Sequence, residues 1–107
     1  MALWLKSDGT RVEVEPLNGK TFSLDELQEY VGGHIELLPF MKNVLNRTFL
    51  RQYFSLKELR YYMVLNEEGK IHGLPLNKNA TMLVEGRLYI DDYICGDVLI
   101  CKINQID

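Results

Sequence analysis

The chain has 107 residues, of which 47% are hydrophobic and 25% are charged, and its net charge is −3. This length fits one small domain, and the composition excludes long disordered or low-complexity regions. The negative charge disfavours general nucleic-acid binding, and no apolar run approaches the roughly 18 residues that span a bilayer. We therefore expect a cytoplasmic protein without a membrane partner.

Turn and capping residues predict the first elements. Residues 3–5 and 12–15 are predicted strands, joined through Asp8-Gly9, a strong hairpin signal. Ser23 followed by Glu26 forms a capping box, which predicts a main helix from Ser23 to Val31. Gly32-Gly33 then ends this helix, because glycine readily takes the left-handed conformation there.

Three later segments are predicted as strands: residues 34–38 closed by Pro39, residues 61–65, and residues 97–103. The last two are apolar at both parities, which predicts central positions with both faces covered. Asn77 begins a predicted short helix over 77–84 that Gly86 would end. The pattern predicts a single α+β domain over 1–107. Its sheet is mixed or mainly antiparallel with five to seven strands, beside one main helix and one or two short ones.

The segment from Met41 to Arg60 differs from the rest of the chain in charge. It holds five basic residues and one acid, whereas the remainder holds seven basic and fourteen acidic residues. Two conformations fit it: a helix with Leu45, Phe49 and Tyr53 on one face, or a strand hairpin turning near Asn46. The asymmetry indicates an anionic partner for this basic, aromatic, insertion-like segment.

Four blocks carry a family resemblance: Val31-Gly32-Gly33-x-Ile35-Glu36, Val64 to Lys70, Gly73-Leu74-Pro75-x-Asn77-x-x-Ala80-Thr81, and Ile94-x-Gly96 to Ile100. In this order, spanning Leu24 to Ile100, they resemble domain-of-unknown-function family 3846 of phages and mobile elements. The resemblance implies an accessory protein of a bacteriophage or mobile element, and it implies no reaction and no catalytic residue. The segment 41–60 is longer than the usual connection there.

Within the blocks, the residues themselves predict mainly structural roles. Asn66-Glu67-Glu68-Gly69 suits a type I turn with Gly69 in a left-handed conformation, which is typical of a hairpin. The helix start at Asn77 exposes backbone amides that suit an anion, with Lys78, Asn79 and Thr81 beside them. The other interpretation of Asn77 is a simple N-cap.

The basic segment supplies the other candidate ligand groups. If it is helical, Arg47 and Arg51 project from one side, and guanidinium groups bind phosphates and stack on aromatic rings. The predicted ligand-binding residues are Arg47, Arg51, Tyr53, Asn77, Lys78, Asn79 and Thr81. The other interpretation is that the aromatic residues pack inward while the arginines are solvated or pair with a second protomer.

Catalytic and metal-binding patterns are missing from the sequence. His34 and His72 are far apart, and Cys95 and Cys101 lie in an apolar pattern typical of buried cysteine. We expect no enzyme activity, metal or cofactor. The leading hypothesis is a homo-oligomeric phage accessory protein in the host bacterium that sequesters a phosphorylated, nucleotide-derived defence signal. The alternative is an inhibitor that binds a host enzyme or defence protein, and a third hypothesis is a small hydrolase or transferase that uses a cysteine or histidine.

Overall fold

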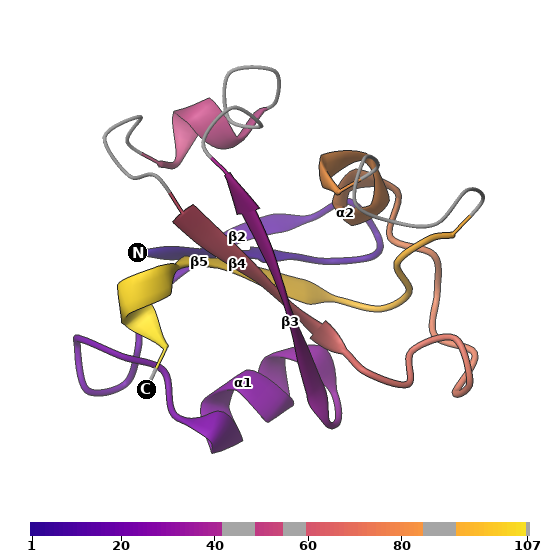
Figure 1. The fold of residues 1–107 in the computed structure, drawn as a ribbon, viewed down its shortest axis with the longest axis horizontal. Helices are drawn as coiled ribbons and strands as arrows, with labels where there is room; N and C mark the ends of the chain where they lie inside the picture. Colours follow the sequence, from indigo (N-terminus) through magenta and orange to yellow (C-terminus); the bar gives the residue numbers. More distant parts are fainter. Residues whose placement is uncertain (42–48, 55–59, 85–91, 107) are drawn as a thin grey trace.

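The computed structural model describes residues 1–41, 49–54, 60–84 and 92–106. Five strands form one antiparallel sheet in the order β2-β1-β5-β4-β3: β1 (Ala2–Leu5), β2 (Arg11–Val14), β3 (Ile35–Met41), β4 (Arg60–Asn66) and β5 (Val98–Lys102). Two α-helices, α1 (Leu24–Val31) and α2 (Lys78–Leu83), and the 3-10 helices η2 (Phe49–Gln52) and η4 (Ile103–Gln105) complete it (Figure 1). The predicted α+β class, strand number and antiparallel pairing are confirmed.

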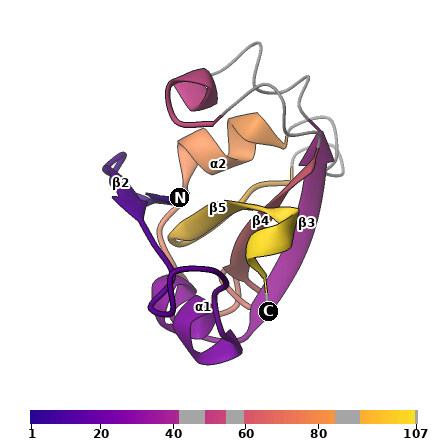
Figure 2. The same cartoon turned by 90° about the vertical axis from the view of Figure 1, so that its left-hand side faces the viewer.

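The sheet lies between two helical layers, with α1 on one face and α2 and η2 on the other (Figure 2). Alternating residues of each strand supply the two cores. On β4, Met63 packs toward the α2 face and Val64 toward the α1 face. Both β4 and β5 have a strand on each side, so the prediction that they are central and doubly covered is confirmed.

Strand β3 corrects one prediction. Pro39 was expected to end the strand, but β3 continues to Met41 and pairs Pro39 with Tyr62. Because β3 is an edge strand, one of its sides makes no hydrogen bonds to another strand. Proline, which lacks an N–H, is therefore tolerated there.

The main helix begins as its sequence predicts. Ser23 Oγ accepts from the Glu26 N–H at 3.2 Å, and Glu26 accepts from the Ser23 N–H at 3.0 Å, so the capping box is complete. The other Glu26 oxygen accepts from the Leu17 N–H at 2.9 Å. Gly32 ends the helix with φ of 79°, in the left-handed region that favours glycine.

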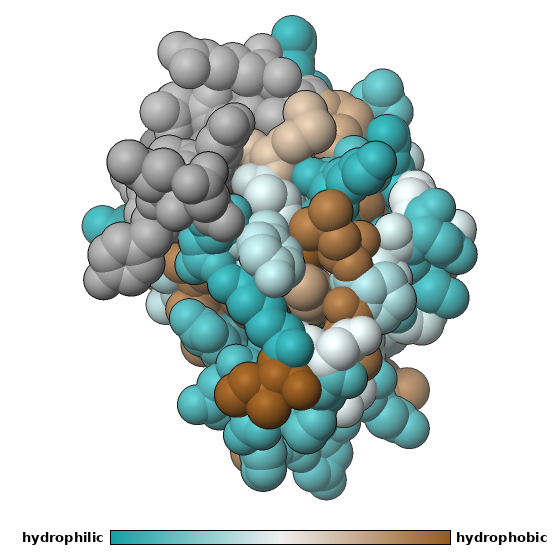
Figure 3. All heavy atoms as spheres, turned by 90° about the vertical axis from the view of Figure 1, so that its right-hand side faces the viewer, coloured by the Kyte–Doolittle hydropathy of each residue, from teal (hydrophilic) through white to brown (hydrophobic). Residues whose placement is uncertain are grey.

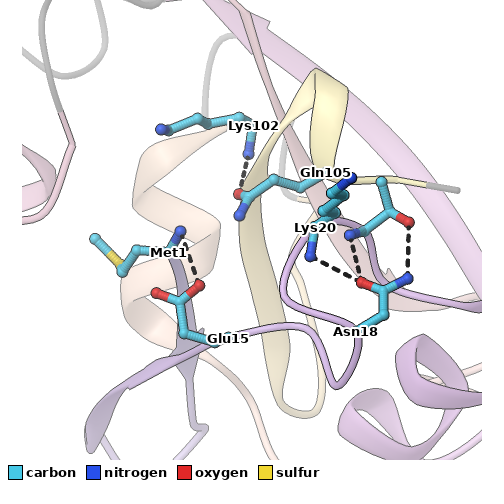
Figure 4. A network of polar contacts seen from close by, with 7 residues as sticks. Met1, Glu15, Asn18, Lys20, Lys102 and Gln105 are labelled. Carbon is cyan, nitrogen blue, oxygen red and sulfur yellow. Dashed lines mark hydrogen bonds and ion pairs between the residues drawn. The ribbon is translucent and has the colours of Figure 1, made fainter.

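The residues before α1 are tied to the C-terminal segment. Asn18 Oδ1 accepts from the N–H groups of Lys20 and Thr21, which closes the turn, and the Met1 ammonium lies 3.4 Å from Glu15 (Figure 4). The Phe22 N–H donates to the Gln105 carbonyl at 2.7 Å, which fixes η4 beside this turn.

The capping box predicts a pH effect. The backbone N–H groups of Ser23 and then Leu17 hold the pKa of Glu26 below its ordinary value of 4.5. The ionised carboxylate therefore stabilises the fold above about pH 4.5, and this contribution is lost as the pH falls through the lowered pKa. At neutral pH the wild type should unfold at a higher urea concentration than Glu26→Gln. The difference between the two unfolding midpoints should disappear in acid. Glu29→Gln, later in the same helix, is the control for charge removal; a gap that persists at pH 2 would contradict this account.

Candidate functional site

The loop that leaves β4 and the segment that leads into β5 lie side by side. The Asn77 N–H donates to the Ile94 carbonyl at 2.8 Å, and the Gly96 N–H donates to the Pro75 carbonyl at 2.7 Å. Between them, Leu76 and Cys95 form an isolated antiparallel bridge. This pairing places the best-recognised stretch of the sequence at one end of the sheet.

The predicted turn at Asn66–Gly69 forms, with the Gly69 N–H donating to the Asn66 carbonyl at 3.3 Å, but it does not lead into a hairpin. Residues 67–73 form successive turns that leave the sheet, and the next strand among the residues that the structure describes is β5. Gly73, with φ of 67°, takes the left-handed conformation that was expected at Gly69. At Gly69 a close approach requires glycine instead, because an added Cβ would lie 2.6 Å from the Cys95 carbonyl oxygen.

Asn66 holds the start of this turn. Its buried side chain donates to the Val31 carbonyl at 3.1 Å and accepts from the Glu68 N–H at 2.8 Å. The Glu67 N–H donates to the His34 carbonyl at 2.9 Å. The Asn66 amide therefore joins the end of α1 to the turn after β4, and the Glu67 backbone bond adds the residue before β3.

Asn77 is the second buried anchor. Its Oδ1 accepts from the Ala80 N–H at 3.1 Å, which caps α2, and its Nδ2 donates to the Leu5 and Gly96 carbonyls, each at 3.0 Å. Thr81 Oγ1 donates to the Asn77 carbonyl and accepts from the Ile94 N–H, both at 2.9 Å. Both side chains are occupied by partners within the chain.

A cavity of about 410 Å³ lies between the turn and the segment before β5. Its walls carry the carboxylates of Glu36, Glu67, Glu68 and Asp92 and the ammonium of Lys70. Lys70 pairs with Asp92 and lies 4.5 Å from the centre of the Tyr93 ring, and Glu68 lies 3.1 Å from His72. Leu38, Leu65 and Ile94 supply the apolar part of the lining. The cavity is therefore acidic around an apolar floor.

An open apolar hollow adjoins this cavity, lined by Leu76, Lys78, Thr81, Met82 and Tyr93. The exposed fractions are 44% for Leu76, 71% for Met82 and 44% for Tyr93, and Ile71 in the neighbouring cavity wall is 81% exposed. We call Ile71, Leu76, Met82 and Tyr93 the apolar patch. Figure 3 looks onto this side of the molecule, where apolar side chains interrupt a hydrophilic surface. Grouped exposed apolar residues of this kind mark contact sites more often than isolated ones do.

The residues predicted to bind a ligand are only partly brought together. Lys78 and Asn79, exposed and half-buried respectively, lie at the start of α2. Arg51 is exposed and Tyr53 is half-buried against the core, in and after η2. Both helices cover the same face of the sheet, but the cavities at α2 include neither Arg51 nor Tyr53. Arg47 and most of the segment 41–60 lie outside the described residues.

The cysteines are buried, as the sequence predicts. Burial raises the pKa of the Cys101 thiol to about 12, so it stays protonated at neutral pH and is a poor nucleophile. Among the described residues, no group of three or more His, Cys, Asp or Glu side chains is arranged to hold a metal ion. Within the same ranges, no helix is long and apolar enough to cross a membrane.

Comparison with known proteins places the chain in a family. The model of the domain of unknown function DUF3846 matches residues 52–107, which is just over half of the sequence. The chain belongs to this family. No curated protein and no solved structure matches it.

The DUF3846 match agrees with the resemblance predicted from the sequence, over a shorter range. It includes β4, the turn, α2 and β5, and therefore the walls of the cavity and the hollow except for β3. The block around Gly32-Gly33 precedes the matched residues. The family description assigns no activity, so the site has to be interpreted from its own residues.

The apolar patch and the acidic cavity were not predicted. A signal for them exists in the sequence, because Ile71 stands in a run of turn residues and Met82 falls outside the buried positions Ala80 and Leu83 of α2. An apolar residue in such a position has no core to enter. Glu36 and Asp92, by contrast, are 56 positions apart, and only the fold brings them to one cavity.

The Asn77 contacts predict a large loss of stability for Asn77→Ala. The substitution removes the cap of α2 and leaves two buried carbonyls without their donor, at a cost of about 2–4 kcal/mol in the free energy of unfolding. Urea unfolding at pH 7 measures it. Asn79→Ala, two positions later in the same helix, should change stability by less than about 0.5 kcal/mol. Equal losses at both positions would contradict this role for Asn77.

Proposed function

We propose that this DUF3846 protein is a non-catalytic interaction protein of a phage or mobile element that inhibits a host enzyme or defence protein by binding it. The observation that carries the proposal is the apolar patch beside the acidic cavity. The side chains of Met82 and Ile71 are 71% and 81% exposed. Exposing apolar surface to water is unfavourable in free energy, and binding of a partner would bury this surface. The partner surface that fits them is a protein surface, because the hollow is open rather than enclosed.

The rigidity of the surroundings supports a binding role. Leu76 lies between Pro75, whose carbonyl accepts from Gly96, and Asn77, whose amide is held on three sides. Thr81 ties α2 to the segment that carries Tyr93. A surface fixed in this way loses little conformational entropy on binding, which favours affinity.

Capture from a bacterial lysate tests the patch. Proteins that the tagged wild type retains should be lost with the double variant Leu76→Ser plus Met82→Ser. Once a partner is purified, its affinity for this variant should fall by roughly tenfold or more, since each apolar side chain contributes up to about 1.5–3 kcal/mol on full burial. Leu17→Ser is the matched control, because Leu17 is 89% exposed and lines a different cavity. Retention of every captured protein by the double variant would refute the proposal.

Sequestration of a nucleotide-derived signal is the second proposal, and one contact favours it. The Arg11 guanidinium, on β2, lies 3.9 Å from the centre of the Phe49 ring, on η2. Arg51 is exposed on η2 as well. Guanidinium groups beside aromatic rings suit both the phosphates and the base of a nucleotide.

Calorimetric titration separates the two proposals. Cyclic nucleotides and adenosine diphosphate ribose derivatives should release or absorb heat with micromolar protein if the second holds. Arg51→Ala should then weaken binding through the loss of phosphate contacts, whereas Leu76→Ser plus Met82→Ser should leave it unchanged. Absence of heat with all of these compounds would remove the nucleotide proposal and leave the protein-binding one intact.

A further inference from the structure

The apolar hollow and the acidic cavity are neighbours, because Tyr93 lines both. Leu76 and Met82 provide the apolar end. Glu36 from the edge strand β3 and Glu67 from the turn after β4 belong to the acidic end. A partner segment that covers the hollow and continues past Tyr93 therefore brings its next residue toward the cavity.

The charge of this cavity is only partly compensated. Lys70 is engaged by Asp92 and by the ring of Tyr93, and Glu68 has His72 beside it. Over residues 1–41, 49–54, 60–84 and 92–106, neither Glu36 nor Glu67 has an ion-pair partner. An anionic group entering here is repelled, whereas a cation is attracted.

The lining also specifies the kind of cation. Leu38, Leu65 and Ile94 line the cavity beneath the carboxylates. Lysine and arginine side chains match such a lining, because their aliphatic stems cover apolar surface while their charged heads reach polar groups. A polypeptide can supply this side chain and an apolar neighbour together, and a free amine cannot.

We propose that the site binds a polypeptide segment of the partner in which a lysine or arginine stands beside an exposed apolar residue. The apolar side chain occupies the hollow of Leu76, Met82 and Tyr93, and the cation enters the cavity toward Glu36 and Glu67. This inference rests on the proposed protein-binding function and names the chemistry of the partner.

Fluorescence anisotropy with three labelled synthetic peptides tests the specificity. One peptide pairs lysine with leucine, the second replaces lysine by glutamate, and the third replaces leucine by serine. The lysine–leucine peptide should bind the full chain most tightly, and each of the others should bind about tenfold more weakly or worse. Equal binding of the glutamate–leucine peptide would overturn the inference.

A charge variant tests the cavity itself. Glu36→Gln plus Glu67→Gln should weaken the lysine–leucine peptide by about five- to tenfold and flatten the dependence of binding on salt concentration. Glu13→Gln plus Glu29→Gln, which changes the net charge equally at exposed positions away from the cavity, should leave both unchanged. An unaltered salt dependence in the cavity variant would refute the inference.

Two further outcomes identify other occupants. Full displacement of the peptide by a free polyamine at equal concentration, or sedimentation showing a dimer that dissociates on Met82→Ser, would overturn a partner peptide as the ligand. If a captured partner depends on Leu76 and Met82 but the peptides show no preference for lysine, only the present inference fails. If no partner depends on the patch, the proposed function fails.

Discussion

The side-chain amide of Asn77 joins three parts of the fold that are distant in sequence: the start of α2, the end of β1 and the segment before β5. A buried amide is costly unless its donors and acceptor are satisfied, and here each has a partner within the chain. The positions of Leu76 on one side and α2 on the other follow from this junction. The surface that we assign to binding is therefore fixed by a residue that is itself almost fully buried.

The structure separates two kinds of residue in the family's most recognisable stretch. Asn66, Gly69 and Asn77 hold the backbone, through buried amides and through a contact with Cys95 that only glycine permits. Ile71 and Leu76 stand between them and remain exposed. A rigid frame that carries exposed side chains is the usual arrangement of a binding loop.

Local signals were reliable where they act over a few residues. The Ser23–Glu26 capping box, the glycine end of α1 and the N-cap at Asn77 form as predicted, since each depends on hydrogen bonds within one turn. The turn at Asn66–Gly69 forms as predicted, but the predicted end of β3, the hairpin after β4 and the left-handed Gly69 were wrong, because they depend on neighbouring segments. Pro39 is tolerated only because β3 lies at the edge of the sheet. Glycine is required at position 69 because the backbone of Cys95, 26 positions later, packs against it.

The sequence by itself determined the fold class, the main helix and the central strands, because periodicity and capping depend on residues close together in the chain. It also determined membership of the family, through the match over residues 52–107. The tertiary structure alone decided where the apolar patch and the acidic cavity lie. Carboxylates from β3, from the turn and from the segment before β5 meet in one cavity only after the sheet has formed. Likewise, Met82 and Tyr93 become neighbours only because hydrogen bonds from Asn77 and Thr81 hold α2 against that segment. Which distant residues meet depends on tertiary packing, and a local sequence pattern does not predict it.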